Sequence, residues 1–565
     1  MRLGLAMALG LSLSGPALAQ DFPRGHVGAY LAARQAAMEN DYRNAAAYFA
    51  KVIARDRRNP ALLEQAALAY ANLGELPRAV PVARQLQSVG GDSQIGNMVL
   101  VVDQLLRGDY AATLEDLDAG RSVGPLVDVL IRGWAELAMG DPEAAFATFA
   151  AAEDEPALAA FARFHAALAR AAAGDFEAAE AIFAEADGQS LRRTRRGVIA
   201  HAEILGRLGR NDEAVALIDS AFGPGADPRL TDLRDRLVAG ERVPFSAVPT
   251  VQDGMAEVFY TVAGALNGEA ADAYTLLYAR MAQALAPENA DAILLSAGLL
   301  ERLGQFELAT QTYAEVPRDA PAFYAAELGR AEALRRADRV DEAIAVLEQL
   351  AATHGDLPIV HTTLGDTLRQ QERFDAASQA YDRAIALFGE DDRSQWFVYY
   401  ARGITHERED RWQQAEADFR KALELNPGQP SVLNYLGYSY VEMQENLDEA
   451  LAMIEQAVAA EPENGYIVDS LGWVLYRLGR YDEAVEHMEK AAALMPVDPI
   501  VNDHLGDVYW AVGRKVEAEF QWRRALSFDP EPEAADRIRR KLEVGLDRVL
   551  EEEGAEPLHM ANDAN

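Results

Sequence analysis

The sequence predicts an all-α fold: a right-handed α-solenoid of about fourteen helical hairpins, closed at its C-terminal end by a capping helix. Half of the 565 residues are hydrophobic, and the apolar share leans on alanine, the residue with the highest helix propensity. In the C-terminal half, one glycine recurs every 34 to 38 residues, and two alanines follow it at nearly constant distances. Repeats of this period are typical of solenoids, in which each hairpin buries its apolar face against the next.

Residues 1–19 are expected to be a signal peptide. Arg2 supplies the positive start, an apolar run follows from Leu3 to Leu13, and Ala17-Leu18-Ala19 fits a small-x-small cleavage site. The apolar run is shorter than the roughly 20 residues needed to span a bilayer. The chain has no cysteine, which excludes disulfides, thiolate metal sites, a cysteine nucleophile and a lipid on an N-terminal cysteine. We therefore expect a periplasmic protein, cleaved after Ala19, with no direct membrane anchor.

The formal net charge of −37 argues strongly against non-specific binding to nucleic acid or anionic lipid, which requires positive surfaces. One local exception is the arginine cluster Arg192, Arg193, Arg195 and Arg196. We interpret this cluster as a solvated helix start rather than a binding patch.

An N-terminal solenoid is predicted over residues 20–222. Turn glycines recur there at intervals of 32 to 35 residues, at Gly74, Gly108, Gly140, Gly174 and Gly209. Residues 223–252 are rich in proline and glycine and are predicted to be an irregular joint with at most one short helix, around Leu230–Leu237. This joint would separate two solenoid segments.

A C-terminal solenoid is predicted over residues 253–530. Its glycines are Gly365, Gly403, Gly437, Gly472 and Gly506. Each glycine is expected where the two helices of a hairpin cross closely, because a larger side chain would push them apart. Four residues after the first alanine stands a large side chain on the buried face, in turn Tyr381, Phe419, Ile454, Met488 and Trp522. Four units close with a proline that ends the second helix, at Pro427, Pro462, Pro496 and Pro530.

Residues 531–552 are predicted to form the capping helix. Ile538, Leu542, Leu546 and Val549 make an apolar stripe along this charged segment, and the open end of a helical stack needs such a cover. Residues 553–565 are expected to be a disordered acidic tail.

The glycine, the alanines and the period together resemble the tetratricopeptide repeat family. The runs beginning at Leu433, Asp469 and Asp503 further resemble a group of proteobacterial envelope proteins with these repeats. Some members of that group are outer-membrane lipoproteins that act as adaptors of a carboxyl-terminal processing protease and deliver cell-wall hydrolases to it. The resemblance implies an adaptor role, although this chain lacks the cysteine on which those adaptors are lipidated.

No catalytic, cofactor or metal motif is present. The sequence contains no HExxH, GxSxG or GxxxxGK[ST], and no GxGxxG that opens a helix after a strand. His504 lies beside Asp503 and Asp507, which could form a metal or acid–base site, but we interpret these as polar repeat positions facing the groove. We therefore expect no enzyme activity and no cofactor.

Partner-binding residues are predicted on the first helix of each hairpin, which lines the concave wall. Aromatic rings beside polar groups provide large contact area at low entropic cost. The alternative is that these rings pack between neighbouring helices. In cytosolic co-chaperones with such repeats, Lys and Asn side chains on the first helices clamp the C-terminal carboxylate of a partner. Here Asn434, Asp469 and Asp503 occupy the first of these positions, and the carboxylates of the two aspartates would repel such a ligand. The candidates are Tyr400, Asn434, Tyr438, Asp469, Trp473, Tyr476, Asp503, Asp507 and Trp510.

The function predicted from these features is a non-enzymatic periplasmic adaptor that binds a protein partner or an extended peptide in its concave groove. A protease or a cell-wall enzyme is the partner class that the resemblance implies. The alternative is a structural scaffold for an envelope assembly, such as exopolysaccharide export or cytochrome maturation. A third class is glycan binding or catalysis on cell-wall polymers, because aromatic rings can stack on sugars.

Overall fold

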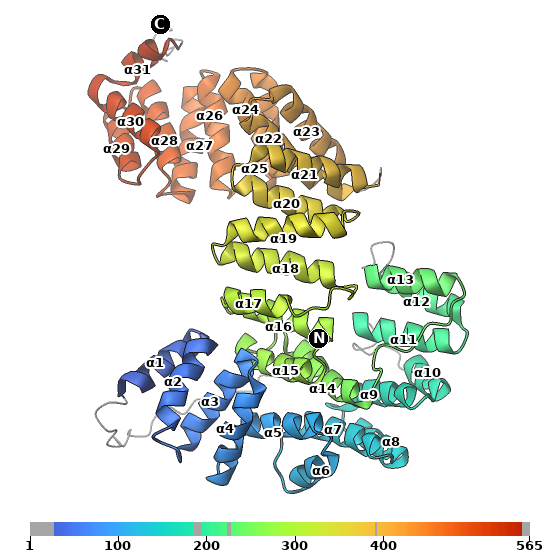
Figure 1. Ribbon diagram of the computed structural model, residues 1–565. Coiled ribbons are helices and arrows are strands. Elements are labelled where there is room, and N and C mark those ends of the chain that lie inside the picture. Colours follow the sequence, from blue (N-terminus) through green and yellow to red (C-terminus); the bar gives the residue numbers. More distant parts are fainter. Residues whose placement is uncertain (1–26, 186–193, 223–227, 390–392, 556–565) are drawn as a thin grey trace. The chain divides into compact units, whose positions relative to one another are not determined.

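The computed structural model describes residues 27–185, 194–222, 228–389 and 393–555 (Figure 1). Over these residues the chain forms 31 α-helices, one short 3-10 helix and no strand. Fourteen hairpins succeed one another in chain order, with α13, α30 and α31 outside them. The predicted all-α solenoid is therefore confirmed. The predicted signal peptide lies outside the described residues, and so do residues 223–227 of the joint and residues 556–565 of the tail.

The chain divides into two compact units, Met1–Val346 and Leu347–Asn565. This division differs from the predicted joint at residues 223–252, because the helices after that joint pack on the first repeats.

Among the described residues, no helix is long and apolar enough to cross a membrane.

Unit 1 contains the helices up to α18, and α19 crosses its boundary. Their bounds are α1 (Val27–Met38), α2 (Tyr42–Ile53), α3 (Pro60–Leu73), α4 (Leu76–Ser88), α5 (Gln94–Leu106), α6 (Tyr110–Asp118), α7 (Pro125–Ala138), α8 (Pro142–Glu153), α9 (Ala159–Ala172), α10 (Phe176–Glu185), α11 (Arg195–Arg207), α12 (Asn211–Phe222), α13 (Pro228–Val238), α14 (Val251–Leu266), α15 (Asp272–Leu285), α16 (Ala290–Arg302), α17 (Phe306–Tyr313), α18 (Phe323–Arg336) and α19 (Val340–Thr353).

The predicted turn glycines of unit 1 end the first helix of their hairpins. All five have a left-handed φ of between 71° and 87°, a conformation that glycine adopts without steric penalty. The backbone N–H of Gly74, for example, donates to the carbonyl of Ala71, which is the hydrogen bond that closes the last turn of α3.

In unit 1, α14 and α15 pack along the first helices of the early hairpins (Figure 1). Helix α14 contacts α7 and α9, and α15 contacts α3 and α5. The fit is close, because a Cβ on Gly254 of α14 would lie 2.4 Å from the ring of Trp134 on α7. One hydrophobic cluster consequently runs from Ala33 to Ala333. The expectation that each hairpin packs only on its sequence neighbours is thus wrong for this unit.

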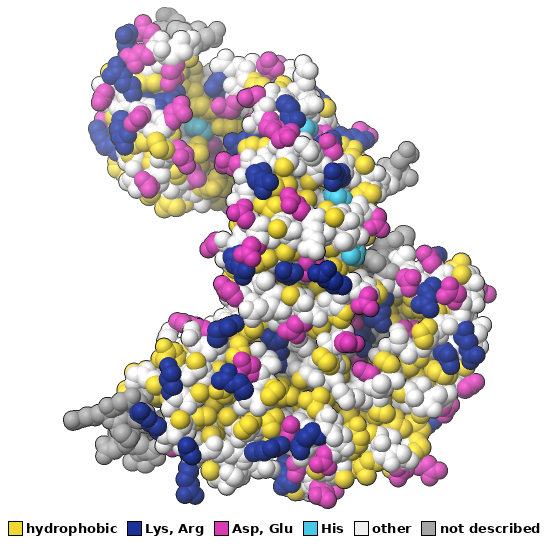
Figure 2. Space-filling model, in the orientation of Figure 1, with side chains coloured by type: hydrophobic (Ala, Val, Ile, Leu, Met, Phe, Trp, Pro, Cys, Tyr) yellow, Lys and Arg dark blue, Asp and Glu magenta, His cyan; other side chains and the backbone are white. Residues whose placement is uncertain are grey.

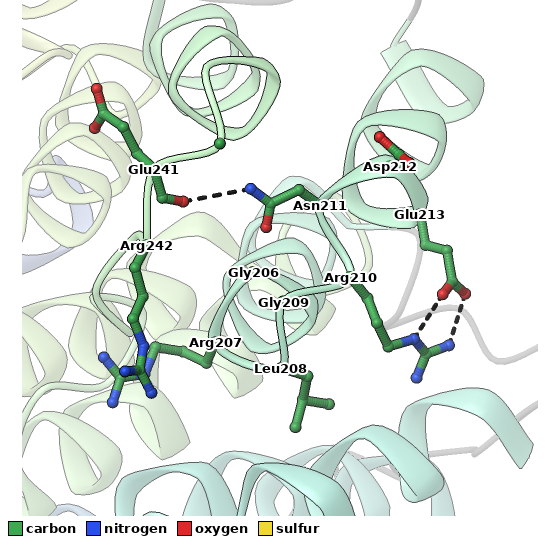
Figure 3. A pocket seen from close by; sticks show the side chains of 11 residues that line it. Gly206, Arg207, Leu208, Gly209, Arg210, Asn211, Asp212, Glu213, Glu241 and Arg242 are labelled. Carbon is green, nitrogen blue, oxygen red and sulfur yellow. Dashed lines mark hydrogen bonds and ion pairs between the residues drawn. The ribbon is translucent and has the colours of Figure 1, made fainter.

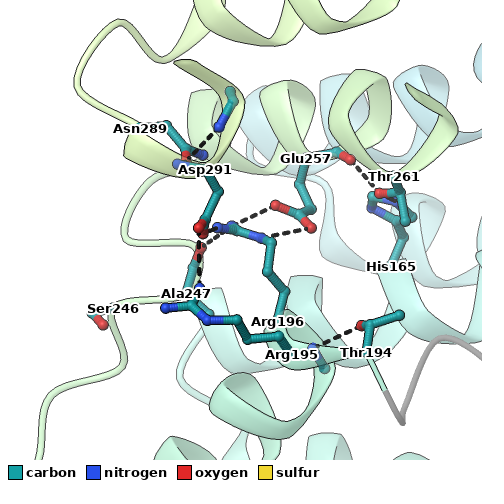
Figure 4. A network of polar contacts seen from close by, with 12 residues as sticks. His165, Thr194, Arg195, Arg196, Ser246, Ala247, Glu257, Thr261, Asn289 and Asp291 are labelled. Carbon is teal, nitrogen blue, oxygen red and sulfur yellow. Dashed lines mark hydrogen bonds and ion pairs between the residues drawn. The ribbon is translucent and has the colours of Figure 1, made fainter. Parts of the chain in front are cut away.

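A buried ion-pair network fixes α11 against α14 and α16 (Figure 4). The Arg196 guanidinium donates to Glu257 at 2.5 Å and to Asp291 at 2.6 Å, and its side chain is only 13% exposed. Burial raises the pKa of Glu257, because the charged form loses solvation, although the neighbouring Arg196 opposes that rise. Arg195 also pairs with Asp291.

The interpretation of these two arginines as a solvated helix start is therefore wrong, while Arg192 and Arg193 lie outside the described residues. On the face drawn in Figure 2, acidic and basic side chains are interspersed.

Unit 2 contains the helices from α20 onward. Their bounds are α20 (Pro358–Gln370), α21 (Phe374–Leu387), the 3-10 turn η3 (Arg393–Gln395), α22 (Trp396–Arg408), α23 (Trp412–Leu425), α24 (Pro430–Met443), α25 (Leu447–Ala460), α26 (Gly465–Arg477), α27 (Tyr481–Leu494), α28 (Pro499–Ala511), α29 (Lys515–Leu526), α30 (Pro532–Val544) and α31 (Leu546–Glu553).

The predicted crossing of glycine and large side chain is confirmed in all five hairpins from α20 to α29. A Cβ added to Gly365, Gly403, Gly437, Gly472 or Gly506 would lie 2.4–2.8 Å from the side chain of Tyr381, Phe419, Ile454, Met488 or Trp522, respectively. Real Cβ atoms do not approach so closely, so the glycines set the separation of the paired helices. The second helices of the last four hairpins end before the predicted prolines.

The cap at the end of unit 2 is two helices rather than the single helix predicted over residues 531–552. The break lies at Gly545, whose φ is +84° and where a Cβ would come within 2.6 Å of the Trp510 ring. The stripe residues Ile538, Leu546 and Val549 are buried, as expected of a cover for the stack.

Candidate functional site

A groove of about 590 Å³ lies within unit 2, on the first helices of successive hairpins. It runs from the end of α22 across α24 and α26 to the start of α28. Its lining is Glu407, Arg408, Asp410, Trp412, Asn434, Tyr435, Tyr438, Ser439, Glu442, Met443, Tyr466, Asp469, Ser470, Asp498, Ile500 and Val501.

Large apolar side chains in this groove are exposed to solvent. Tyr466 is 62% exposed, Ile500 58% and Met443 38%. These three come from α26, α28 and α24, so the groove presents apolar surface on three successive hairpins. Exposed apolar side chains that line one groove, together with a few polar groups, are available for contact with a partner.

The polar lining of the groove is dominated by carboxylates. Glu407, Asp410, Glu442, Asp469 and Asp498 line it, against a single cation, Arg408. The carboxylate of Glu442 accepts a hydrogen bond from Trp473 Nε1 at 2.8 Å, and that of Glu407 accepts one from Tyr435 Oη at 3.3 Å. The groove therefore suits a partner that is apolar and positively charged.

Three of the predicted residues line the groove together, namely Asn434, Tyr438 and Asp469. The Oδ1 atom of Asn434 is buried and has no hydrogen-bond partner among the described residues. Burial of Tyr438 raises the pKa of its hydroxyl, and the charges of Glu442 and Asp469 raise it further, so this group is a neutral donor near neutral pH. Tyr400 lies just outside, with its ring 5.9 Å from that of Tyr435.

Trp473 and Tyr476 are packed inside the stack and leave less than a tenth of their surface exposed. Their rings stack on each other at 4.8 Å, and Trp473 also stacks on His504 of the next hairpin at 4.0 Å. These two rings therefore pack between neighbouring first helices, which was the alternative to partner binding. They support the floor of the groove rather than line it.

His504 is a buried partner of Asp469. Its Nδ1 lies 3.0 Å from the nearer carboxylate oxygen of that residue. Burial alone would lower the pKa of His504, but the negative charges of Asp469, Asp503 and Asp507 outweigh it and raise the pKa above its usual value. Within the described part of the chain, no group of three or more His, Asp or Glu side chains is arranged to hold a metal ion.

Asp503, Asp507 and Trp510 lie beneath the C-terminal helices. Lys541 of α30 donates to Asp503 at 2.9 Å and to Asp507 at 2.7 Å, and its own side chain is fully buried. The indole N–H of Trp510 donates to Asp547 of α31 at 2.9 Å. The cap thus already covers the inner wall of the last hairpin.

Several groove residues were not predicted, above all Tyr435, Ser439, Glu442, Tyr466 and Ile500. The first three could have been predicted from helical spacing, because Tyr435, Ser439 and Glu442 lie on the same helix face as Asn434 and Tyr438. Tyr466 and Ile500 lie in the first turns of α26 and α28. So far from the repeat glycine, helical spacing does not indicate which residues face the groove.

A second pocket, in unit 1, is formed by the turn between α11 and α12 together with residues 240–242 (Figure 3). Its volume is about 830 Å³. Arg207, Arg210 and Arg242 line it, and so do Asp212, Glu213 and Glu241; Arg210 pairs with Glu213 at 2.6 Å. Because the charges of the two signs balance, this pocket favours no particular ligand charge.

Comparison with known families identifies repeats in the same region as the groove. Two models, both described as tetratricopeptide repeat, match: one at residues 400–465, 436–499 and 470–531, the other at residues 356–428. A TPR repeat-containing protein of Pseudomonas aeruginosa is 28% identical over 159 residues, which are 28% of this chain and 26% of that protein.

A chloroplastic tetratricopeptide repeat domain-containing protein of Arabidopsis thaliana is 32% identical over 101 residues, which are 18% of this chain and 33% of that protein. The chain thus spans about a quarter to a third of the length of these relatives.

Two solved structures align with this chain at low TM-scores. The APC/C hetero-tetramer Cut9-Hcn1 aligns with 92% of this chain and 96% of its own, at a TM-score of 0.38 and 16% identity. YrrB, described as a TPR protein with an unusual peptide-binding site, aligns with 34% of this chain and 97% of its own, at a TM-score of 0.28 and 19% identity.

Proposed function

Because residues 356–531 of this chain are tetratricopeptide repeats, we propose that it is a non-enzymatic adaptor that holds a protein partner in the groove of unit 2. The observation that carries this proposal is the exposed apolar surface of Tyr466, Ile500 and Met443 inside a groove of about 590 Å³. Tetratricopeptide repeats mediate protein–protein interaction in general, which supports the same class of function.

The proposed location is the periplasm. The positively charged start, the short apolar run and the small-x-small site within residues 1–19 support export. The partner class proposed from the resemblance to envelope adaptors is a protease or a cell-wall enzyme.

The proposal is tested by affinity capture from periplasmic extract of the source organism. The variant Tyr466→Ala/Ile500→Ala should lose an identified partner that the wild type captures. Ile359→Ala/Phe397→Ala is the matched control, because Ile359 is 50% and Phe397 40% exposed in unit 2 and neither lines the groove. Retention of every partner by the groove variant would contradict the proposal.

A second candidate function is a structural scaffold for an envelope assembly. It is favoured by a separate exposed apolar pair on α29, Val516 at 81% and Phe520 at 62%. These side chains are four residues apart and therefore lie on one helical face. If the scaffold function holds, Phe520→Ala should disrupt a stable complex that the groove variant leaves intact.

A further inference from the structure

The chain already shows what kind of segment the inner wall of unit 2 accepts. At the last hairpin that wall is covered by α30, whose Lys541 side chain is fully buried between the carboxylates of Asp503 and Asp507. Arg537, one turn earlier, lies 3.6 Å from Asp507. Ile538, beside them on the same helix, is 1% exposed. The occupant is thus a helix that presents cations and an apolar residue to carboxylates.

Unit 1 also has a helix with a buried cation over its first helices, but there the cation is bound by neutral oxygens. Helix α15 packs along α3 and α5, and its Arg280 is only 5% exposed. The Arg280 guanidinium donates to the carbonyl of Asn72 at the end of α3, at 3.2 Å, and to Thr312 Oγ1 at 3.1 Å. In both units, therefore, the segment that covers the first helices is itself a helix with a buried cation.

The groove between α22 and the start of α28 offers similar chemistry. It combines five carboxylates and one arginine with the exposed side chains of Met443, Tyr466 and Ile500. The excess of carboxylates over cations in this lining favours a cationic ligand.

We infer that the groove of unit 2 binds a cationic amphipathic helix, with lysine or arginine beside leucine-like residues on one face. This inference rests on the proposed function and specifies its partner. A helix satisfies its own backbone hydrogen bonds, so the groove needs to supply only side-chain contacts. The carboxylates of Glu407, Asp410 and Glu442 bind the cations, while Tyr466 and Ile500 cover the apolar residues.

The experiment uses two fluorescein-labelled synthetic peptides of about 18 residues, long enough to form a helix. Both are helices of leucine and alanine with charged residues along the edge of the leucine face. These residues are lysines in the first peptide and glutamates in the second. Anisotropy titration with the full chain should show binding of the lysine peptide only. Glu407→Gln/Asp410→Asn/Glu442→Gln should weaken that binding about tenfold, as expected for the loss of several partly exposed ion pairs.

Two controls separate groove binding from general attraction to an acidic protein. Glu445→Gln/Glu455→Gln/Glu486→Gln removes the same charge from exposed positions of unit 2 outside the groove and should change the affinity less than twofold. Tyr466→Ala should weaken binding more than Phe397→Ala, which truncates an exposed ring of unit 2 outside the groove.

Equal weakening by the two charge-neutralised variants would overturn the inference. Groove-dependent binding of the glutamate peptide would also overturn it, but would leave the proposed adaptor function standing. If neither peptide responds to any groove variant while partner capture still depends on the groove, the inference fails and the proposed function survives.

Discussion

Single residues set the spacing of the hairpins in unit 2. Gly506 faces the Trp522 ring, and the indole N–H of Trp522 donates to Asp507 at 2.9 Å. This contact was predictable from the sequence, because the glycine, the alanines and the large residue recur at nearly fixed distances. What the sequence did not reveal is the hydrogen bond that orients the ring, since many carboxylates lie at similar spacing.

Gly506→Ala is expected to destabilise unit 2 by about 1–3 kcal/mol, because the added Cβ would overlap a fully buried indole. Five of the six tryptophans lie after residue 395, so fluorescence-detected urea unfolding reports mainly on this unit. Gly389→Ala is the control, because nothing lies within 4 Å of the Cβ it would add. Equal stability of the two variants would contradict the close crossing.

Lys541→Met should destabilise unit 2 by roughly 3–5 kcal/mol, because it leaves Asp503 and Asp507 buried without their cation. Arg539→Met removes an exposed cation from the same helix and should change stability by less than about 0.5 kcal/mol. Adding Asp503→Asn and Asp507→Asn to Lys541→Met should recover part of the loss. If Lys541→Met unfolds at the same urea concentration as the wild type, the buried pairing is absent.

His504 gives the stability of unit 2 a pH dependence. Its pKa is raised in the folded protein by Asp469, Asp503 and Asp507, so the protonated histidine stabilises the fold. That contribution is full below the unfolded pKa of about 6.5 and is lost as the pH rises through the folded pKa. The stability difference between the wild type and His504→Gln should therefore be larger near about pH 6 than near about pH 9. A difference that grows with pH would have the wrong sign.

Whole helices account for the main departures from the sequence prediction. Helices α14 and α15 have the length and hydrophobicity of an ordinary hairpin, so their periodicity did not reveal that they pack on α3, α5, α7 and α9. Contacts between segments so far apart, 96 residues for His165 and Thr261 and 208 for Asn72 and Arg280, leave no local sequence signal. Helix α30 departs less from its prediction, because its apolar stripe did predict a cap. Nothing in the sequence distinguished Lys541 from the exposed charged residues of the same segment.

The packing of α15 on α5 can be tested by cross-linking. Tyr274 Oη donates to Gln94 Oε1 at 3.3 Å, so cysteines at these two positions should be joined by a short bis-maleimide. Because the natural chain has no cysteine, the double variant contains only this pair. Digestion and mass spectrometry should identify a linked peptide that spans residues 94 and 274. Only single-site adducts, as in each single-cysteine variant, would contradict this packing.

Across the whole molecule, the chain covers much of its own inner wall. Helices α14 and α15 occupy it in unit 1, and α30 covers its last hairpin in unit 2. Of the nine predicted partner-binding residues, Asn434, Tyr438 and Asp469 line the groove that is left uncovered in unit 2. The sequence pattern pointed to helices that line this groove. It could not separate residues that line the groove from those packed beneath it, because both kinds occupy the same positions of successive repeats.

Photocross-linking in living cells, with a photoreactive amino acid placed at position 466 or at position 520, tests whether the groove of unit 2 holds a protein partner. Tyr466 and Phe520 are both 62% exposed, but only Tyr466 lies in the groove. We expect a discrete protein adduct from position 466 that is absent from position 520. Adducts from position 520 alone, or the same adducts from both positions, would contradict this expectation.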